Sequence, residues 1–264
     1  MITNFNKIPQ TLLRKIIETV IGKEEITWYK TLNWEQAIYP FQSPKIAYPD
    51  YYTSVNYHGI KNGYLNPIAA MTYDVITPLA TLPSEQWLRQ CLLNTITAKP
   101  KNILDLGCGT GTNTINLKKR FPNAVVTGLD LSPYMLIIAE KKCKKNQQEI
   151  LWKQGLAEAT EISSFFYDLI TISLLFHEVP NTISQAILQE SLRLLKANGQ
   201  LIILDANQNR LRHFKWLTQL FREPYSFTYA QGNIREWLEK IGFQAIKSKP
   251  IGGIYQITSA YKPE

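Results

Sequence analysis

The sequence has few of the residues that build disulfide frameworks and metal sites. Its 264 residues include only three cysteines and three histidines. Cys91, Cys108 and Cys143 are odd in number and widely spaced, which argues against a disulfide framework and against a zinc site. No apolar run approaches the roughly 18 residues of a membrane span, and residues 1–20 lack a signal-peptide core. We therefore expect a cytoplasmic protein without a metal, with at most peripheral membrane contact.

Acidic residues are also scarce relative to basic ones. The chain has 21 Asp and Glu against 29 Lys and Arg, a net charge of +8, and such a balance favours an acidic partner. Many of these bases gather at the ends of two expected helices, where cations complement the helix dipole. They are Lys118, Lys119, Arg120, Lys141, Lys142, Lys144 and Lys145. We interpret most of this charge as solvated helix surface. The 45% of hydrophobic residues allows a sizeable core and excludes global disorder.

The most informative stretch is ILDLGCGTGTNT, residues 103–114. An apolar run ends in Gly107, Gly109 and Gly111, and a helical pattern follows, which predicts a buried strand, a glycine turn and a helix. A ligand can lie against bare backbone at such a turn, because no Cβ stands in the way. Asp130 follows at the end of a second apolar strand, VVTGLD, where an acid can bind both ribose hydroxyls. Together these features predict a nucleoside-binding site.

Strand and helix patterns alternate from about residue 85. Alternation of this kind predicts a parallel sheet with right-handed crossovers, and the last two strands form a hairpin. We expect an α/β fold with a doubly wound, seven-stranded, mostly parallel sheet and a C-terminal antiparallel hairpin. The expected strands are residues 101–106, 124–129, 149–153, 168–174, 199–205, 243–249 and 254–261.

Residues 1–84 are rich in tyrosine and proline and lack the regular strand and helix alternation of residues 85–264. We therefore expect an N-terminal helical and aromatic cap, or lid, over the core. An amphipathic helix is expected over residues 9–21. Beyond it, the prolines from Pro40 to Pro83 are expected to interrupt every long periodic pattern. The tyrosine-rich stretch YPDYYTSVNYHGIKNGYLNP is too apolar for a disordered tail, which predicts that it packs across the core.

The G-x-G-x-G spacing differs from the G-x-G-x-x-G of dinucleotide enzymes. With Asp105 two residues before the first glycine, it resembles motif I of the class I S-adenosylmethionine (SAM) methyltransferases. The core resembles small-molecule enzymes of the ubiquinone/menaquinone C-methyltransferase type. Further motifs resemble a group of uncharacterised methyltransferases from cyanobacteria and chloroplasts: YYT at 51–53, NYHG at 56–59, GYL at 63–65, HEVP at 177–180, REPY at 222–225 and the final SAYKP. The resemblance implies a Rossmann-like methyltransferase fold, SAM as cofactor and a photosynthetic source.

Several residues at the carboxyl ends of the expected strands are candidates to hold SAM. Asp105 would hold the amino end of SAM, partly through its backbone or water, beside Gly107, Gly109 and Gly111. Asp130 would bind the ribose.

Further candidates surround the expected position of the adenine. Leu131 and Met135 could flank the ring, although ordinary helix packing explains them equally well. Leu156 stands where the family often has an acid, so the backbone of Ala157 could serve instead. Glu158 is either a contact to the adenine or an acid at a helix N-terminus.

Two histidines are the candidate catalytic residues. His177 follows the strand at 168–174 and would be a general base, since a neutral imidazole titrates near working pH; packing or capping is the alternative. His58, in the expected cap, could reach the site from above. Asp205, at the end of another strand, could orient a substrate or cap a helix.

Three functions compete on this sequence. The first is a SAM-dependent methyltransferase acting on a small aromatic or apolar metabolite, such as a phenol or a quinol. The second is an RNA methyltransferase; against it, the chain shows neither an appended RNA-binding module nor the Asn/Asp-Pro-Pro-aromatic motif of amino-group base methylases. The third is a SAM-binding protein that does not catalyse. A narrow apolar slot beside SAM would favour a small molecule, whereas an open basic groove would favour RNA.

Overall fold

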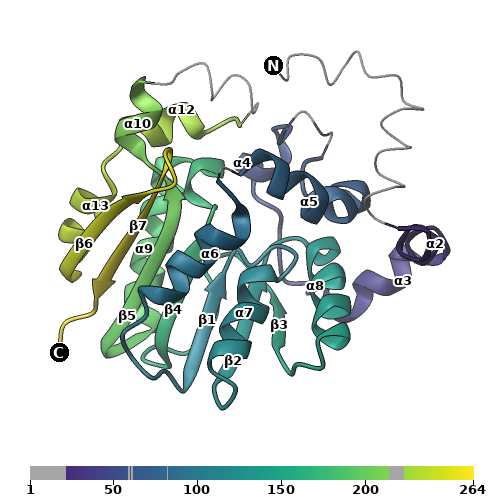
Figure 1. The fold of residues 1–264 in the computed structure, drawn as a ribbon, viewed down its shortest axis with the longest axis horizontal. Coiled ribbons are helices and arrows are strands. Elements are labelled where there is room, and N and C mark those ends of the chain that lie inside the picture. Colours follow the sequence, from purple (N-terminus) through teal and green to yellow (C-terminus); the bar gives the residue numbers. More distant parts are fainter. Residues whose placement is uncertain (1–21, 59, 61, 82, 214–222) are drawn as a thin grey trace.

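A computed structural model of the chain describes residues 22–58, 60, 62–81, 83–213 and 223–264 (Figure 1). The helix expected over residues 9–21 lies outside these residues. The described part contains a seven-stranded sheet with the order β3-β2-β1-β4-β5-β7-β6. Its strands are β1 (Asn102–Leu106), β2 (Val125–Asp130), β3 (Leu151–Gln154), β4 (Tyr167–Ser173), β5 (Leu195–Ala206), β6 (Gln244–Ile251) and β7 (Tyr255–Tyr261).

Strands β1 to β5 pair in parallel, and β7 runs antiparallel to both β5 and β6. The predicted fold is therefore confirmed, including the C-terminal hairpin. The strand order reverses at β1, since β2 lies on one side of it and β4 on the other. Ligands of open α/β sheets bind at this switch point, outside the carboxyl ends of the strands.

Helices cover both faces of the sheet (Figure 1). On one face lie α6 (Glu85–Asn94), α7 (Thr112–Arg120) and α8 (Pro133–Lys145); on the other lie α9 (Asn181–Leu194) and α13 (Ile234–Ile241). Side chains alternate between the faces along each strand. Leu104 and Leu201 pack with the α9 and α13 face, whereas their neighbours Ile103 and Ile202 pack with the α6 and α7 face. Burial on both sides explains why the strands read as continuous apolar runs.

The segments before α6 lie over the carboxyl ends of the strands and beside α8 (Figure 1). They are α2 (Lys23–Thr31), α3 (Trp34–Ile38), η2 (Tyr39–Phe41), α4 (Asp50–Thr53) and α5 (Pro67–Ala80). The short helices η3 (Phe176–Glu178), α10 (Gln208–His213) and α12 (Ser226–Gln231) complete the described elements. No described helix is long and apolar enough to cross a membrane.

Helix α5 corrects the expectation that prolines interrupt every long pattern before residue 84, because it runs for 14 residues. Pro67 occupies the start of the helix, where an N–H would have no intrahelical partner in any case. The side chain of Asn66 accepts a hydrogen bond from the N–H of Ile68 at 2.8 Å and so caps the helix. Pro78 lies in the last turn, where its missing N–H disturbs only the helix end.

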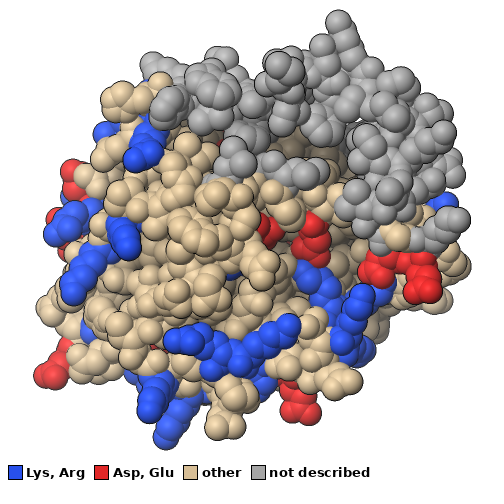
Figure 2. Space-filling model, viewed as in Figure 1, with Lys and Arg blue, Asp and Glu red and all other residues tan. Residues whose placement is uncertain are grey.

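At the end of α7 the predicted solvated surface holds for Lys119 and Arg120, which are exposed, whereas Lys118 is half-buried and donates to the carbonyls of Pro122 and Ala124. It is wrong for two lysines of α8. The Nζ of Lys141 lies 2.8 Å from a carboxylate oxygen of Glu25 and 3.6 Å from the ring centre of Trp28. These contacts, and a similar one from Lys142, tie the N-terminal helices to the core. Figure 2 shows the other Lys and Arg side chains spread among uncharged residues on this face.

Truncation of a buried side chain in the sheet should lower the free energy of unfolding. Leu201 on β5 is fully buried, so Leu201→Ala should lower the free energy of unfolding by about 2–5 kcal/mol. Leu151→Ala is the matched control, since Leu151 on β3 is 60% exposed and should change stability by less than about 0.5 kcal/mol. Urea unfolding measures both variants. Equal losses would contradict the described burial of β5.

Candidate functional site

The glycine turn follows β1 as predicted. Gly107, Gly109 and Gly111 have φ angles of +66°, +53° and +76°, a left-handed region that favours glycine. A Cβ on Gly109 would meet nothing within 4 Å, and Gly109 lines a cavity. The turn therefore presents bare backbone to that cavity. Gly111 does not line it; a Cβ there would lie 2.6 Å from the ring of Trp152, so its role is close packing at the start of α7.

Asp130 ends β2 and faces the same cavity. One carboxylate oxygen accepts a hydrogen bond from the N–H of Gly109 at 2.7 Å, and the other accepts one from the N–H of Ser132 at 2.8 Å. Burial raises the pKa of Asp130 to about 6, against the lowering effect of these two hydrogen bonds. The carboxylate is thus fixed beside the glycine turn, where the sequence places it.

Asp105 lies beneath the turn and does not line the cavity. Its fully buried carboxylate accepts hydrogen bonds from Asn113 Nδ2 at 2.9 Å, Thr114 Oγ1 at 2.6 Å and Thr171 Oγ1 at 2.6 Å. These donors come from α7 and β4. The structure gives no support to a side-chain contact between Asp105 and the amino end of SAM, because the carboxylate joins elements of the core.

The cavity lies at the carboxyl ends of β1, β2 and β4. It contains about 730 Å³ of empty space, part of it open to solvent. Its lining includes seven of the predicted cofactor residues: Gly107, Gly109, Asp130, Leu131, Met135, Ala157 and Glu158. No Lys, Arg or His belongs to the lining that the described residues form.

Five tyrosines, here called the tyrosine wall, line the same cavity as the glycine turn. Its members come from residues 51–73 and are Tyr51, Tyr52, Tyr57, Tyr64 and Tyr73. The rings of Tyr57 and Tyr64 stack with centroids 5.3 Å apart. Ser132 Oγ, in the core, donates a hydrogen bond to the backbone carbonyl of Tyr64 at 2.6 Å. Residues from the expected cap therefore form part of the cavity.

Glu158 lies in a turn after β3 rather than at the start of a helix, so the helix-terminus interpretation is wrong. Its Oε1 accepts a hydrogen bond from Tyr51 Oη at 2.6 Å. Together with Leu156 and Ala157, Glu158 lines the cavity beyond Asp130.

His177 is buried in η3 and does not line the cavity. Its Nδ1 lies 2.5 Å from Asp205 Oδ1, and its Nε2 lies 3.7 Å from Glu223 Oε1 and 3.9 Å from Glu178 Oε1. Burial alone would lower the pKa of His177, but these carboxylates outweigh it and raise the pKa to about 10. The imidazole is therefore protonated at neutral pH. This corrects the general-base interpretation, which needs a neutral ring.

His58 adopts a φ of +50° at the edge of the tyrosine wall. Its Nε2 lies 2.9 Å from Tyr64 Oη and 3.2 Å from Glu178 Oε1. Tyr64 Oη in turn donates to Glu178 Oε1 at 2.6 Å. Glu178 itself lines the cavity. Glu178 was not among the candidate residues predicted from the sequence; its position in the segment that follows β4 was the available signal.

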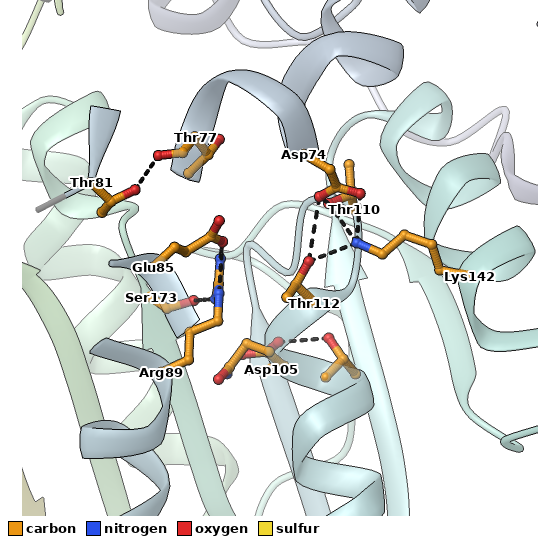
Figure 3. A network of polar contacts seen from close by, with 12 residues as sticks. Asp74, Thr77, Thr81, Glu85, Arg89, Asp105, Thr110, Thr112, Lys142 and Ser173 are labelled. Atoms are coloured by element: carbon orange, nitrogen blue, oxygen red, sulfur yellow. Dashed lines mark hydrogen bonds and ion pairs between the residues drawn. The ribbon is translucent and has the colours of Figure 1, made fainter. Parts of the chain in front are cut away.

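Figure 3 shows polar contacts that join α5 to the glycine turn and to α8, with a second group around Arg89. Asp74 on α5 accepts a hydrogen bond from Thr110 Oγ1 at 2.6 Å and pairs with Lys142 Nζ at 2.7 Å. Thr110 belongs to the glycine turn, so this carboxylate ties a cap helix directly to the turn. In a neighbouring pair, Arg89 donates to Ser173 Oγ at 3.3 Å while bound to Glu85.

The sequence is similar to those of known methyltransferases. A family model described as a methyltransferase domain matches residues 103–199. A demethylmenaquinone methyltransferase of Thermus thermophilus is 31% identical over 52% of this chain and 61% of its own length. An uncharacterized methyltransferase of Synechocystis is 28% identical over 71% of this chain and 90% of its own length. This chain thus spans about three fifths of the first relative.

The fold has counterparts among solved structures. A phosphoethanolamine N-methyltransferase of Haemonchus contortus, in complex with S-adenosyl-L-methionine, superposes with a TM-score of 0.60 over 75% of this chain and 58% of that one, at 15% identity. At this identity the similarity establishes the fold.

The charge of His177 should make stability depend on pH. Its folded pKa of about 10 lies above the ordinary value of 6.5, so its stabilisation is full below pH 6.5 and is lost as the pH rises through about 10. The difference in unfolding free energy between wild type and His177→Gln should therefore shrink from pH 6.5 to 10. Urea unfolding across this range measures it. His213→Gln is the control, because it removes an exposed histidine. A difference in unfolding free energy between wild type and His177→Gln that does not change with pH would contradict the protonation of His177.

Proposed function

We propose that this chain, which carries a class I SAM-dependent methyltransferase domain, transfers the methyl group of SAM to a small aromatic or apolar molecule. One observation carries the proposal: a single cavity is lined both by the glycine turn with Asp130 and by five tyrosines of the N-terminal segment. A cofactor and an acceptor that bind in one cavity can be aligned for the transfer.

The residues present fit SAM. The open space beside Gly109 admits a ligand against the backbone of the turn. Asp130 would accept hydrogen bonds from the ribose hydroxyls, and Leu131 and Met135 offer apolar surface for the adenine. Helix α7 begins directly after the glycine turn, and the first N–H groups of a helix suit a carboxylate. When bound, SAM supplies an electrophilic methyl group on a sulfonium.

The acceptor side of the cavity suits an aromatic ring. Tyrosines pack against other rings edge-on or offset, at a gain of about 0.5–1.5 kcal/mol per pair. The demethylmenaquinone methyltransferases among the relatives make quinols the first acceptor class to test. The tyrosine wall comes from residues 51–73, within the expected cap of residues 1–84, which would act as the lid over the acceptor.

RNA fits this cavity less well. Binding a nucleic acid depends on Lys and Arg that neutralise its phosphates, yet the described lining holds carboxylates and no cation: Asp130, Glu158 and Glu178 are its charged members. A SAM-binding protein without catalysis would need a blocked acceptor space, whereas this cavity continues from the glycine turn to the tyrosines. The lack of cations in the described lining and the continuity of the cavity favour a small, uncharged or cationic acceptor.

The cofactor assignment predicts the effect of two substitutions. Asp130→Ala removes a charged acceptor of hydrogen bonds, which costs about 1.5–3 kcal/mol, so SAM should bind roughly ten- to a hundred-fold more weakly. Gly109→Val places a side chain in the open space of the cavity and should weaken SAM binding at least about tenfold. Isothermal titration calorimetry with SAM measures both.

Gly253→Val is the matched control for Gly109→Val. Gly253 also has a left-handed φ, +83°, and open space around its missing Cβ, but it lies in the β6–β7 turn and not in the cavity lining. Both valines impose similar backbone strain, and only one fills the cavity. Unchanged SAM affinity in folded Asp130→Ala and Gly109→Val would remove the proposed cofactor site.

The acceptor class can be tested with the wild-type protein. Release of S-adenosylhomocysteine should depend on added phenols or quinols and should stay at background with RNA oligonucleotides, because the cavity repels phosphates. A panel of both compound classes at equal concentration provides the comparison. Turnover with RNA alone would replace the small-molecule proposal with an RNA methyltransferase.

A further inference from the structure

Glu178 stands apart from the other two carboxylates of the cavity. Asp130 is held by two backbone N–H groups beside the glycine turn, on the cofactor side. Glu158 is held by Tyr51 next to Ala157, also on that side in the proposed binding mode. Glu178 instead follows β4 across the switch point, where its carboxylate contacts Tyr64 and His58.

Two donors from the N-terminal segment fix one oxygen of Glu178. Tyr64 Oη donates to Oε1 at 2.6 Å, and His58 Nε2 lies 3.2 Å from the same atom. Burial, and then the charge of Glu178, hold the pKa of Tyr64 well above its usual value, so the phenol remains a donor. A carboxylate accepts about four hydrogen bonds. These two contacts therefore leave acceptor capacity for a group in the cavity that Glu178 lines.

The charge around the cavity determines which group can approach. The described lining offers three carboxylates and no cation, and the imidazolium of His177 is already surrounded by Asp205, Glu223 and Glu178. An anionic acceptor would meet no cationic side chain among the described lining residues. A neutral hydroxyl or an amino group can instead donate a hydrogen bond to Glu178.

We infer that Glu178 binds the O–H or N–H group of the methyl acceptor and takes its proton, and that Tyr64 and His58 position the carboxylate for this task. This inference rests on the proposed function and assigns the acceptor subsite within it. The acceptor's O–H bond, or the N–H bond of its ammonium form, breaks and the proton passes to a carboxylate oxygen of Glu178. The electron pair stays on the acceptor, which is then the nucleophile toward the methyl group that SAM would supply. The protonated Glu178 then releases its proton to water.

Glu178→Gln tests the proton step, because it keeps the size of the side chain and removes its basicity. The acceptor used is one that the wild type methylates. Its turnover should fall by roughly 10²–10⁴-fold, the usual contribution of a general base, and the affinity for SAM should stay within about twofold of wild type. Glu149→Gln, at an exposed position, is the matched control and should keep full turnover. Normal turnover in folded Glu178→Gln would overturn the inference while the proposed function stands.

A binding experiment tests the subsite without turnover. Catechol, benzylamine and the dimethyl ether of catechol are titrated into the protein with S-adenosylhomocysteine present. The wild type should bind catechol or benzylamine at least about tenfold more tightly than the ether, and Glu178→Gln should lose this preference. Which of the two probes loses more affinity distinguishes a hydroxyl acceptor from an amine. Equal binding of all three probes to the wild type contradicts the inference; no binding of any contradicts the proposed function as well.

Tyr64→Phe tests the positioning role. A carboxylate that loses a hydrogen-bond donor is more easily protonated, so the acidic limb of the pH–rate profile should move to higher pH. A tyrosine that only packs would lower the rate without moving the limb, and that result would remove Tyr64 from the inference. The other titratable and charged groups that face Glu178 are His58, His177, Glu223, Asp130, Tyr52, Tyr57 and Tyr73. All of them are retained in Tyr64→Phe, so the shift isolates the lost hydroxyl.

Discussion

The site depends on the hydrogen bonds of the buried Asp105 carboxylate, which hold its elements together. The carboxylate joins β1, which carries it, to α7 through Asn113 and Thr114 and to β4 through Thr171. Burial raises the pKa of Asp105, and these three donors oppose that effect. An isolated buried carboxylate would be costly, so the three elements must meet for it to be satisfied. Their meeting fixes the start of α7, and with it the glycine turn opposite Asp130.

The N-terminal segments are tied to this frame at the points where function would need them. Asp74 bonds the glycine turn through Thr110, Tyr64 accepts from Ser132 beside Asp130, and Tyr64 and His58 hold Glu178 after β4. The cap is thereby linked to the ends of three core strands. A displacement of these N-terminal segments would move the residues around Asp130 and around Glu178 together.

The fold and the glycine turn could be predicted because their signals are local: apolar strands, helical patterns and glycines at a fixed spacing. The role of His177 could not, because its charge depends on Asp205 and Glu223, which only the folded chain brings near. The same holds for Asp105, whose motif position suggested a ligand contact although its partners lie in α7 and β4. Helix α5 was not predicted because each proline was expected to interrupt a helix, whereas Pro67 lies at the start of this one.

The central claim is that one cavity, between the glycine turn and the tyrosine wall, binds the cofactor beside the acceptor. A crystal structure of the protein grown with S-adenosylhomocysteine tests it most directly. The account predicts ligand density against the backbone of Gly107 and Gly109, with the ribose hydroxyls on Asp130 and the sulfur directed toward the tyrosines and Glu178. Density at another place on the protein, or an empty cavity at saturating ligand, would contradict it.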